Sequence, residues 1–198
     1  ETLLINHIGP SGKSPFTTDH QRQLFRTICR EYPMRSLVHH WGILESDDDE
    51  FSEAQRLLSW SLELPRETVG TLRGESDQNI LTSLGTLHSR MGMRLLKADN
   101  MPDASQHFLD AEQCFRNAKQ GEYPNGHAYH AHAFMLFMRG QTASKYEDKL
   151  YWYGMALGIL ASAQDNLNKD DLQAIHELSA KLYEEIGDEE KVSRYSDI

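Results

Sequence analysis

Hydrophobic residues recur through most of the chain at spacings of three and four positions, which places them along one face of an α-helix. Over residues 17–31, Leu24, Phe25 and Ile28 form such a stripe, and Thr18 or Asp19 can cap its start. The same periodicity predicts further helices over residues 34–45, 52–64, 76–97, 102–120, 125–139, 144–167, 170–186 and 189–195. The pattern therefore predicts an all-α fold of successive antiparallel helix pairs joined by short turns.

Proline and glycine mark the ends of these predicted helices. All six prolines lie between the periodic segments, where a missing backbone donor is tolerated. Residues 65–75 are predicted to form a loop, and Gly187 with Asp188 predicts a sharp break before the last helix. Residues 3–8 have a pattern that suits a β-strand, and the end of a helix is an equal alternative for them. We expect no sheet of consequence.

Successive helix pairs carry small residues at corresponding positions, which indicates an internal repeat. In the first pair Gly42 and Ala54 lie 12 residues apart, and in the second Gly85 and Ala111 lie 26 residues apart. Small side chains at both places allow two helices to cross closely, because a larger side chain would push them apart. The helices of the second pair are therefore expected to be the longer ones.

The second helix of the second pair carries the most specific spacing in the chain. It reads A-x3-F-x2-A, which puts Ala111, Phe115 and Ala118 on one helix face. We expect a helix crossing at Ala111.

A third pair fits the pattern less well. Tyr129 and Ala133 suit its first helix, and its second helix is expected to pack through a face of small residues made by Gly154, Gly158 and Ala161. A fourth pair begins near residue 172 and is truncated, because its second helix has barely begun when the chain ends.

These features resemble the tetratricopeptide repeat, a helix pair whose copies stack into an α-solenoid. In the first pair the resemblance rests on Val38, Trp41, Gly42, Glu45, Ala54, Leu58, Ser61 and the closing Pro65. It divides the chain into a linker with a leading helix, residues 1–33, and a single helical array, residues 34–198. An unrelated helical bundle with coincidental small residues is the alternative.

The succession of FRTICREYP, SLVHHWGILE and an acidic turn is similar to the helical-repeat regions of STAND-type NTPases, which include bacterial antiphage sensors. In those proteins the repeats follow a nucleotide-binding domain. The resemblance implies a C-terminal sensor or oligomerisation module, with catalysis elsewhere in the full protein, and a role in antiviral defence. Because the chain begins with Glu1, we expect it to be part of a longer cytoplasmic protein.

The net charge of the chain disfavours two classes of partner. The chain has 20 basic and 30 acidic residues, a formal net charge of −10, which disfavours nucleic acid and anionic membrane as main partners.

Cys29 and Cys114 each lie in a helical apolar pattern, so we expect buried thiols in a reducing compartment.

No arrangement of residues indicates catalysis or a cofactor. Residues 9–14, GPSGKS, resemble the end of a phosphate-binding loop, but His7 stands where the first glycine is needed and Pro15 removes an amide. The acidic run over residues 47–50 lacks the alternating ligands and central glycine of a calcium loop, so we expect a solvated turn. There is no GxSxG or HExxH motif. We therefore predict no catalytic residue and no cofactor.

The spacing of the histidines predicts no metal site. His127 and His130 share a helix face, whereas His132 points elsewhere, so a third zinc ligand is missing. His39 and His40 are adjacent and face different ways.

If the tetratricopeptide resemblance holds, the first helix of each pair lines a concave binding surface. The binding positions of the family then correspond to His39, His40, Asn79, Thr82, Arg90, His127, His130 and Phe134. Because this polar lining lacks the Lys and Arg set that binds C-terminal acids, we expect a folded protein or a neighbouring domain as the partner. A structural or self-association segment with no ligand of its own, oligomeric through the parent protein, is the alternative.

Overall fold

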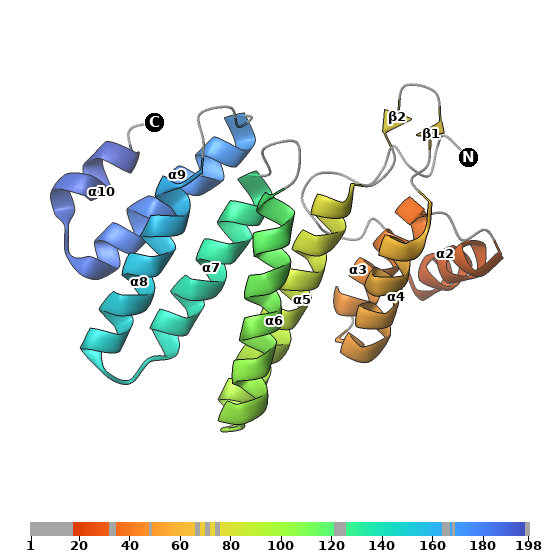
Figure 1. Ribbon diagram of the computed structural model, residues 1–198, viewed down its shortest axis with the longest axis horizontal. Helices are drawn as coiled ribbons and strands as arrows, with labels where there is room; N and C mark the ends of the chain where they lie inside the picture. The colour runs from red at the N-terminus through yellow and green to blue at the C-terminus, as the bar shows by residue number, and fades with distance from the viewer. Residues whose placement is uncertain are drawn as a thin grey trace. The chain divides into compact units, whose positions relative to one another are not determined.

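A computed structural model describes residues 18–31, 35–47, 49–65, 68–69, 72–73, 76–120, 126–163, 167 and 169–196 (Figure 1). The chain divides into two compact units, Glu1–Ser76 and Asp77–Ile198, which we describe separately. The predicted strand or helix end at residues 3–8 and the GPSGKS loop lie outside the described residues.

The first unit consists of α2 (Asp19–Glu31), α3 (Arg35–Asp47) and α4 (Phe51–Glu63), with α3 packed against both of the others (Figure 1). The predicted cap forms at the start of α2, where Thr18 Oγ1 accepts a hydrogen bond from the Gln21 N–H at 3.2 Å and Gln21 Oε1 accepts one from the Thr18 N–H at 3.2 Å. The core of the unit is built from Phe25, Cys29, Val38, Trp41, Leu44 and Leu57.

The segment over residues 65–75, which was predicted to be a loop, contains two short paired strands. Strands β1 (Thr68–Val69) and β2 (Leu72–Arg73) pair antiparallel, with Thr68 opposite Arg73 and Val69 opposite Leu72. Each strand has two residues, a length too short for the period-two pattern that identifies a strand from sequence. Every other regular element in the described part of the chain is a helix.

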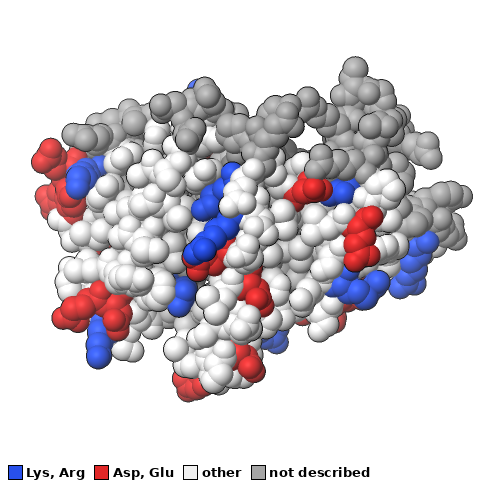
Figure 2. Space-filling model, viewed as in Figure 1, with Lys and Arg blue, Asp and Glu red and all other residues white. Residues whose placement is uncertain are grey.

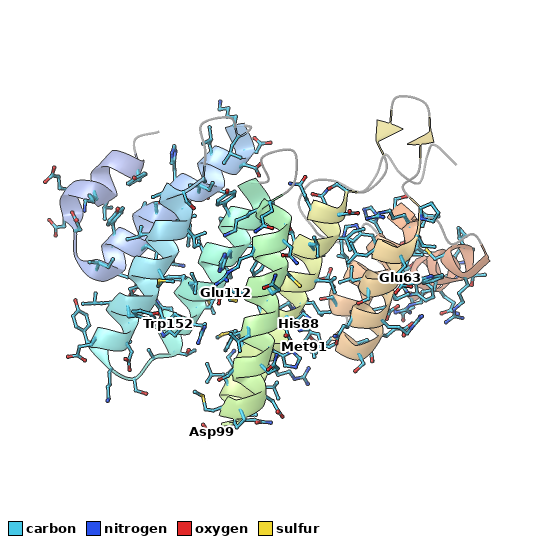
Figure 3. The ribbon with its side chains drawn as sticks, in the orientation of Figure 1. Glu63, His88, Met91, Asp99, Glu112 and Trp152 are labelled. Atoms are coloured by element: carbon cyan, nitrogen blue, oxygen red, sulfur yellow. The ribbon has the colours of Figure 1, made fainter. Side chains whose placement is uncertain are left out.

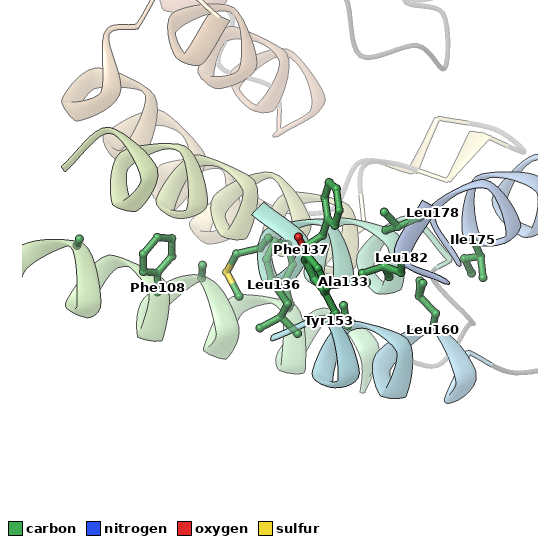
Figure 4. Packing of buried hydrophobic residues seen from close by; sticks show 14 residues of the cluster. Phe108, Ala133, Leu136, Phe137, Tyr153, Leu160, Ile175, Leu178 and Leu182 are labelled. Atoms are coloured by element: carbon green, nitrogen blue, oxygen red, sulfur yellow. The ribbon is translucent and has the colours of Figure 1, made fainter. Parts of the chain in front are cut away.

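The second unit consists of α5 (Asp77–Lys97), α6 (Met101–Lys119), α7 (Gly126–Thr142), α8 (Tyr146–Ala161), α9 (Lys169–Ile186) and α10 (Glu189–Ser196). Each helix packs against the next, and in addition α5 packs against α7 and α7 against α9 (Figure 1). Its core includes Phe108, Ala133, Leu136, Phe137, Tyr153, Leu160, Ile175, Leu178 and Leu182 (Figure 4). Among the described residues, no helix has the length and apolar character needed to cross a membrane.

The predicted helix ends agree with the structure to within three residues, with one exception. Helix α8 ends at Ala161 rather than near residue 167. The Ser162 hydroxyl donates to the Ile159 carbonyl at 2.7 Å and its N–H bonds to the Gly158 carbonyl at 3.1 Å. The segment beyond this point is mostly polar, with Ala163 and Leu167 as the described side chains that still pack against the core.

The predicted helix crossings of the first two pairs are confirmed. A Cβ atom added to Gly42 would lie 2.7 Å from Leu58 Cγ, and one added to Gly85 would lie 2.6 Å from the Phe115 ring. Ala54 and Ala111 are fully buried. These four small residues let α3 approach α4 and α5 approach α6.

The predicted small-residue face of the third pair is wrong. Gly154 and Gly158 are exposed, a Cβ atom on either would meet nothing within 4 Å, and Ala161 is exposed as well. Helix α8 instead turns Tyr153 and its stripe of larger side chains inward, because these remove more apolar surface from water. In this pair, the small residue that allows α7 and α8 to approach closely is Gly140 of α7, which lies against the Tyr153 ring of α8.

Candidate functional site

The residues predicted to contact a partner belong to both units. His39 and His40 lie on α3 in the first unit, and the other six lie in the second. His39 is buried, and His40 Nδ1 lies 2.6 Å from the Ser36 carbonyl oxygen one turn earlier. His39 therefore has no exposed surface to offer.

On α5, three of the predicted residues differ in exposure. Thr82 is buried, and its hydroxyl donates to the Gln78 carbonyl at 2.7 Å. Asn79 is exposed and Arg90 is half-buried. Of these three predicted residues, only Asn79 and Arg90 are accessible.

On α7, the structure brings three predicted residues together. The inner face of α7 is occupied by Ala133, Leu136 and other core residues, so positions 127, 130 and 134 lie along its outer side. The His130 and Phe134 rings stack with centroids 6.2 Å apart, and the Phe134 side chain is 44% exposed.

Charged groups of α9 lie beside this face. The pKa of His130 is lowered, first by burial and then by His127, whereas the carboxylates of Asp171 and Glu177 act in the opposite direction. Lys181 Nζ lies 5.0 Å from the centre of the Phe137 ring, next to Phe134. The outer face of α7 thus combines an exposed aromatic ring with groups of both charges.

As predicted, His132 points away from His127 and His130. It is buried, stacks on Phe115 with ring centroids 5.4 Å apart, and accepts a hydrogen bond at Nδ1 from Lys119 Nζ at 2.9 Å. Burial, followed by the charges of Lys119 and Arg116, lowers the pKa of His132 to about 3. This imidazole is neutral and belongs to the core of the second unit.

A different group of polar side chains converges between α5 and α6. His88 Nδ1 lies 3.0 Å from His107 Nδ1 and 3.9 Å from Asp110 Oδ2. His88, labelled in Figure 3, comes from α5, and the other two come from consecutive turns of α6. Within the described residues, this is the one group of three His, Cys, Asp or Glu side chains whose ligand atoms all lie within 4.8 Å of one another.

The three side chains of this cluster differ in exposure. His88 is only 7% exposed, whereas His107 and Asp110 are half-buried. Burial lowers the pKa of His88, Asp110 opposes that change, and His107 adds to it. The neutral imidazole that results is the form in which histidine binds metals.

The sequence contained part of the signal for this cluster. His107 and Asp110 are three residues apart, so they share one face of a helix, and His88 lies on the same side of the preceding helix as the buried Leu84. Their meeting depends on the register in which α6 folds back along α5, which residue spacing alone does not determine.

Neither thiol is suited to nucleophilic chemistry at neutral pH. Cys29 is buried, and burial raises its pKa to about 12. Cys114 is half-buried, and burial together with the charge of Asp110 raises its pKa to about 11. A thiolate is the reactive form of cysteine, and both groups are held as thiols.

The visible face of the molecule in Figure 2 carries Lys and Arg side chains interspersed with Asp and Glu.

No protein-family model, no curated protein and no solved structure matches the chain.

Proposed function

We propose that the chain is a non-enzymatic protein-binding module with the architecture of a tetratricopeptide-like α-solenoid. The packing order within the second unit supports this proposal. The helices α5, α7 and α9 are the first members of successive pairs. Helix α5 packs against α7, and α7 packs against α9. The second helices α6 and α8 pack against the first helix of the following pair. This nearest-neighbour order is characteristic of stacked repeats.

In such an array the first helices line the binding surface. We define the first-helix surface of the second unit as Asn79, Arg90, His127, His130 and Phe134. Its central feature is the exposed Phe134 ring stacked on His130, which is the observation that carries the proposal. Aromatic side chains are enriched at the centres of protein interfaces because they bury a large area with few rotatable bonds. His39 and Thr82 are left out of this surface because they are buried.

The partner we propose is a folded protein surface or a neighbouring domain of the same polypeptide. Arg90, Lys181, Asp171 and Glu177 on or beside the surface give charges of both signs, which suits a mixed surface better than an acidic tail. A parent protein of the STAND NTPase class, in which the module acts as a sensor, fits this role. The alternative is a self-association segment, for which the same surface would contact a second copy.

The first experiment uses the purified chain immobilised as bait for a lysate of its source cells, with quantitative mass spectrometry. Phe134→Ala is the test variant. Tyr151→Ala is the matched control, because Tyr151 is an aromatic residue of α8 that is 59% exposed. We expect a protein captured by the wild type and by the Tyr151→Ala variant to be lost, by tenfold or more, with Phe134→Ala.

A second measurement separates the two candidates. Light scattering gives the mass of the purified chain and of its Phe134→Ala variant. A dimer that dissociates on substitution of Phe134, without capture of another protein, favours self-association. Equal capture by all three proteins would contradict the proposed surface, provided that circular dichroism finds the helices intact.

A further inference from the structure

We propose that His88, His107 and Asp110 form a binding site for a divalent transition-metal ion, with Zn²⁺ as the best match to the ligand set. Two imidazoles and one carboxylate are ligands that zinc takes in proteins. This site is separate from the first-helix surface, so it does not rest on the proposed function.

The spacing of the ligand atoms supports the site. Zinc holds nitrogen and oxygen ligands at about 2.0–2.2 Å, and two such ligands in a tetrahedral arrangement lie roughly 3.3 Å apart. His88 Nδ1 is 3.0 Å from His107 Nδ1 and 3.9 Å from Asp110 Oδ2. All three ligand atoms lie within 4.8 Å of one another, so side-chain rotation of the half-buried His107 and Asp110 would bring them to the required distance.

The carboxylate is oriented by a neighbour in the manner expected for a metal ligand. Gln106 Nε2 donates a hydrogen bond to Asp110 Oδ1 at 2.9 Å, while the other oxygen, Oδ2, faces His88. Such outer contacts fix the ligand's direction, and their loss typically lowers metal affinity by about 10–100-fold. Gln106 is thus a positioning residue of the site.

The site has three protein ligands from two helices, and the exposure of Asp110 leaves room for a water molecule in a fourth position. A bound ion would connect α5 to α6 across their contact. Binding to the folded chain alone would raise its melting temperature, in proportion to the logarithm of free metal above the dissociation constant.

The competing arrangement is a hydrogen bond between two neutral imidazoles. In that case the N–H at Nδ1 of one ring donates to the bare Nδ1 of the other, which also accounts for a separation of 3.0 Å. The hydrogen bond describes the metal-free pair, and Zn²⁺ would replace it once the proton at Nδ1 has moved to Nε2 of the same ring, so uptake of zinc distinguishes a metal site from a hydrogen-bonded pair alone.

The test uses the whole chain stripped of metal with a chelator and titrated with Zn²⁺ in a calorimeter. Co²⁺ serves as a second probe, because visible absorption bands of bound Co²⁺ report its ligands and geometry. We expect one ion per chain. We also expect His107→Gln and Asp110→Asn each to weaken binding by more than tenfold, and Gln106→Ala to weaken it by about tenfold.

The substitutions are chosen at half-buried or exposed positions so that the fold is retained, which the melting curve without metal checks. His20→Gln is the matched control, because it removes an exposed histidine on α2 that belongs to neither proposed site and should leave the affinity unchanged. The proposal is overturned if the wild type binds no zinc, or if His107→Gln and His20→Gln bind it equally.

Discussion

Arg26 and Glu45 join α2 to α3 through two hydrogen bonds. Arg26 Nε donates to Glu45 Oε1 at 2.6 Å, and its Nη2 donates to Oε2 at 2.9 Å. Trp41 Nε1 donates a third bond to Oε1 at 2.6 Å. The Glu45 side chain is 7% exposed, so its carboxylate depends on these donors in place of water.

We expect Arg26→Ala to lower the free energy of unfolding of the first unit by about 3 kcal/mol, because it leaves a buried carboxylate without its charged partner. Arg56→Ala is the matched control. It breaks an exposed pair with Glu53 on α4 and should cost roughly 0.5 kcal/mol. Urea unfolding of the two variants measures the difference, and equal losses would mean that the burial of Glu45 carries no such cost.

Two glycine substitutions separate packing from helix propensity. Alanine is favoured over glycine in a helix by about 1 kcal/mol, and this gain is common to both sites. Gly158→Ala should therefore stabilise the second unit by about 0.5–1 kcal/mol, since its new Cβ meets nothing within 4 Å. Gly85→Ala should destabilise it by about 1–2 kcal/mol, because the Phe115 ring is in the way. Thermal unfolding that finds both variants stabilised would contradict the close crossing of α5 and α6.

Enlarging the buried face of α6 should have a comparable effect. Ala111 is fully buried, so Ala111→Leu is expected to cost about 1–3 kcal/mol through overpacking. Ala161→Leu makes the same change at an exposed position of α8 and should stay within about 0.5 kcal/mol. A melting temperature unchanged by Ala111→Leu would show that the register of α6 is different.

The buried His132 should make stability fall in acid. Its pKa is about 3 in the folded chain, against an ordinary value of 6.5. The unfolded chain therefore binds the extra proton between these values, and the free energy of unfolding decreases as pH falls from about 6.5 towards 3. The slope approaches about 1.4 kcal/mol per pH unit.

The variant His132→Asn isolates this contribution, because the asparagine oxygen can still accept from Lys119 and does not titrate. We expect its loss of stability between pH 7 and pH 5 to be smaller than that of the wild type. His88 and His130 also have lowered pKa values, and they contribute to the loss in both proteins. Parallel curves for the two proteins would rule out a neutral, buried His132.

The end of α9 provides a test of backbone conformation alone. Gly187 has φ of +84°, and both its N–H and that of Asp188 bond to the Tyr183 carbonyl at 3.0 Å. A Cβ atom there would meet nothing within 4 Å, so Gly187→Ala should cost about 1 kcal/mol from the left-handed backbone only. Gly187→Asn, which tolerates this conformation better, should cost less. Equal stability of all three proteins would argue against the turn.

Helix positions were predictable from sequence because each apolar stripe is local and repeats every three or four residues. The break at Gly187 and the crossing at Gly42 were also predictable from local sequence, because each is marked by a glycine, whose lack of a side chain is visible in the sequence itself. The failure at Gly154 and Gly158 has a physical cause. Helix α8 carries both a small-residue stripe and a larger apolar stripe, and periodicity does not indicate which one is buried.

The candidate sites divide in the same way. Phe134 and His130 lie three to seven residues from His127 on one helix, so their common face followed from spacing. The contact of His88 with His107 spans 19 residues and requires the register between two helices. The burial of His39 and Thr82 depends likewise on neighbouring helices, which the polarity of these residues does not reveal.

The nearest-neighbour packing has a consequence for how the chain is made. Among the described helices, every contact joins elements that are adjacent or next but one in the sequence. Within each unit, every helix after the first therefore finds a packing partner within a short stretch of chain already synthesised, and the loops that must close are small. The described core residues of the first unit all lie between residues 25 and 64, so they can pack before the second unit is synthesised, and the second unit can then extend one helix at a time. Synthesis and folding can proceed in the same direction and in step.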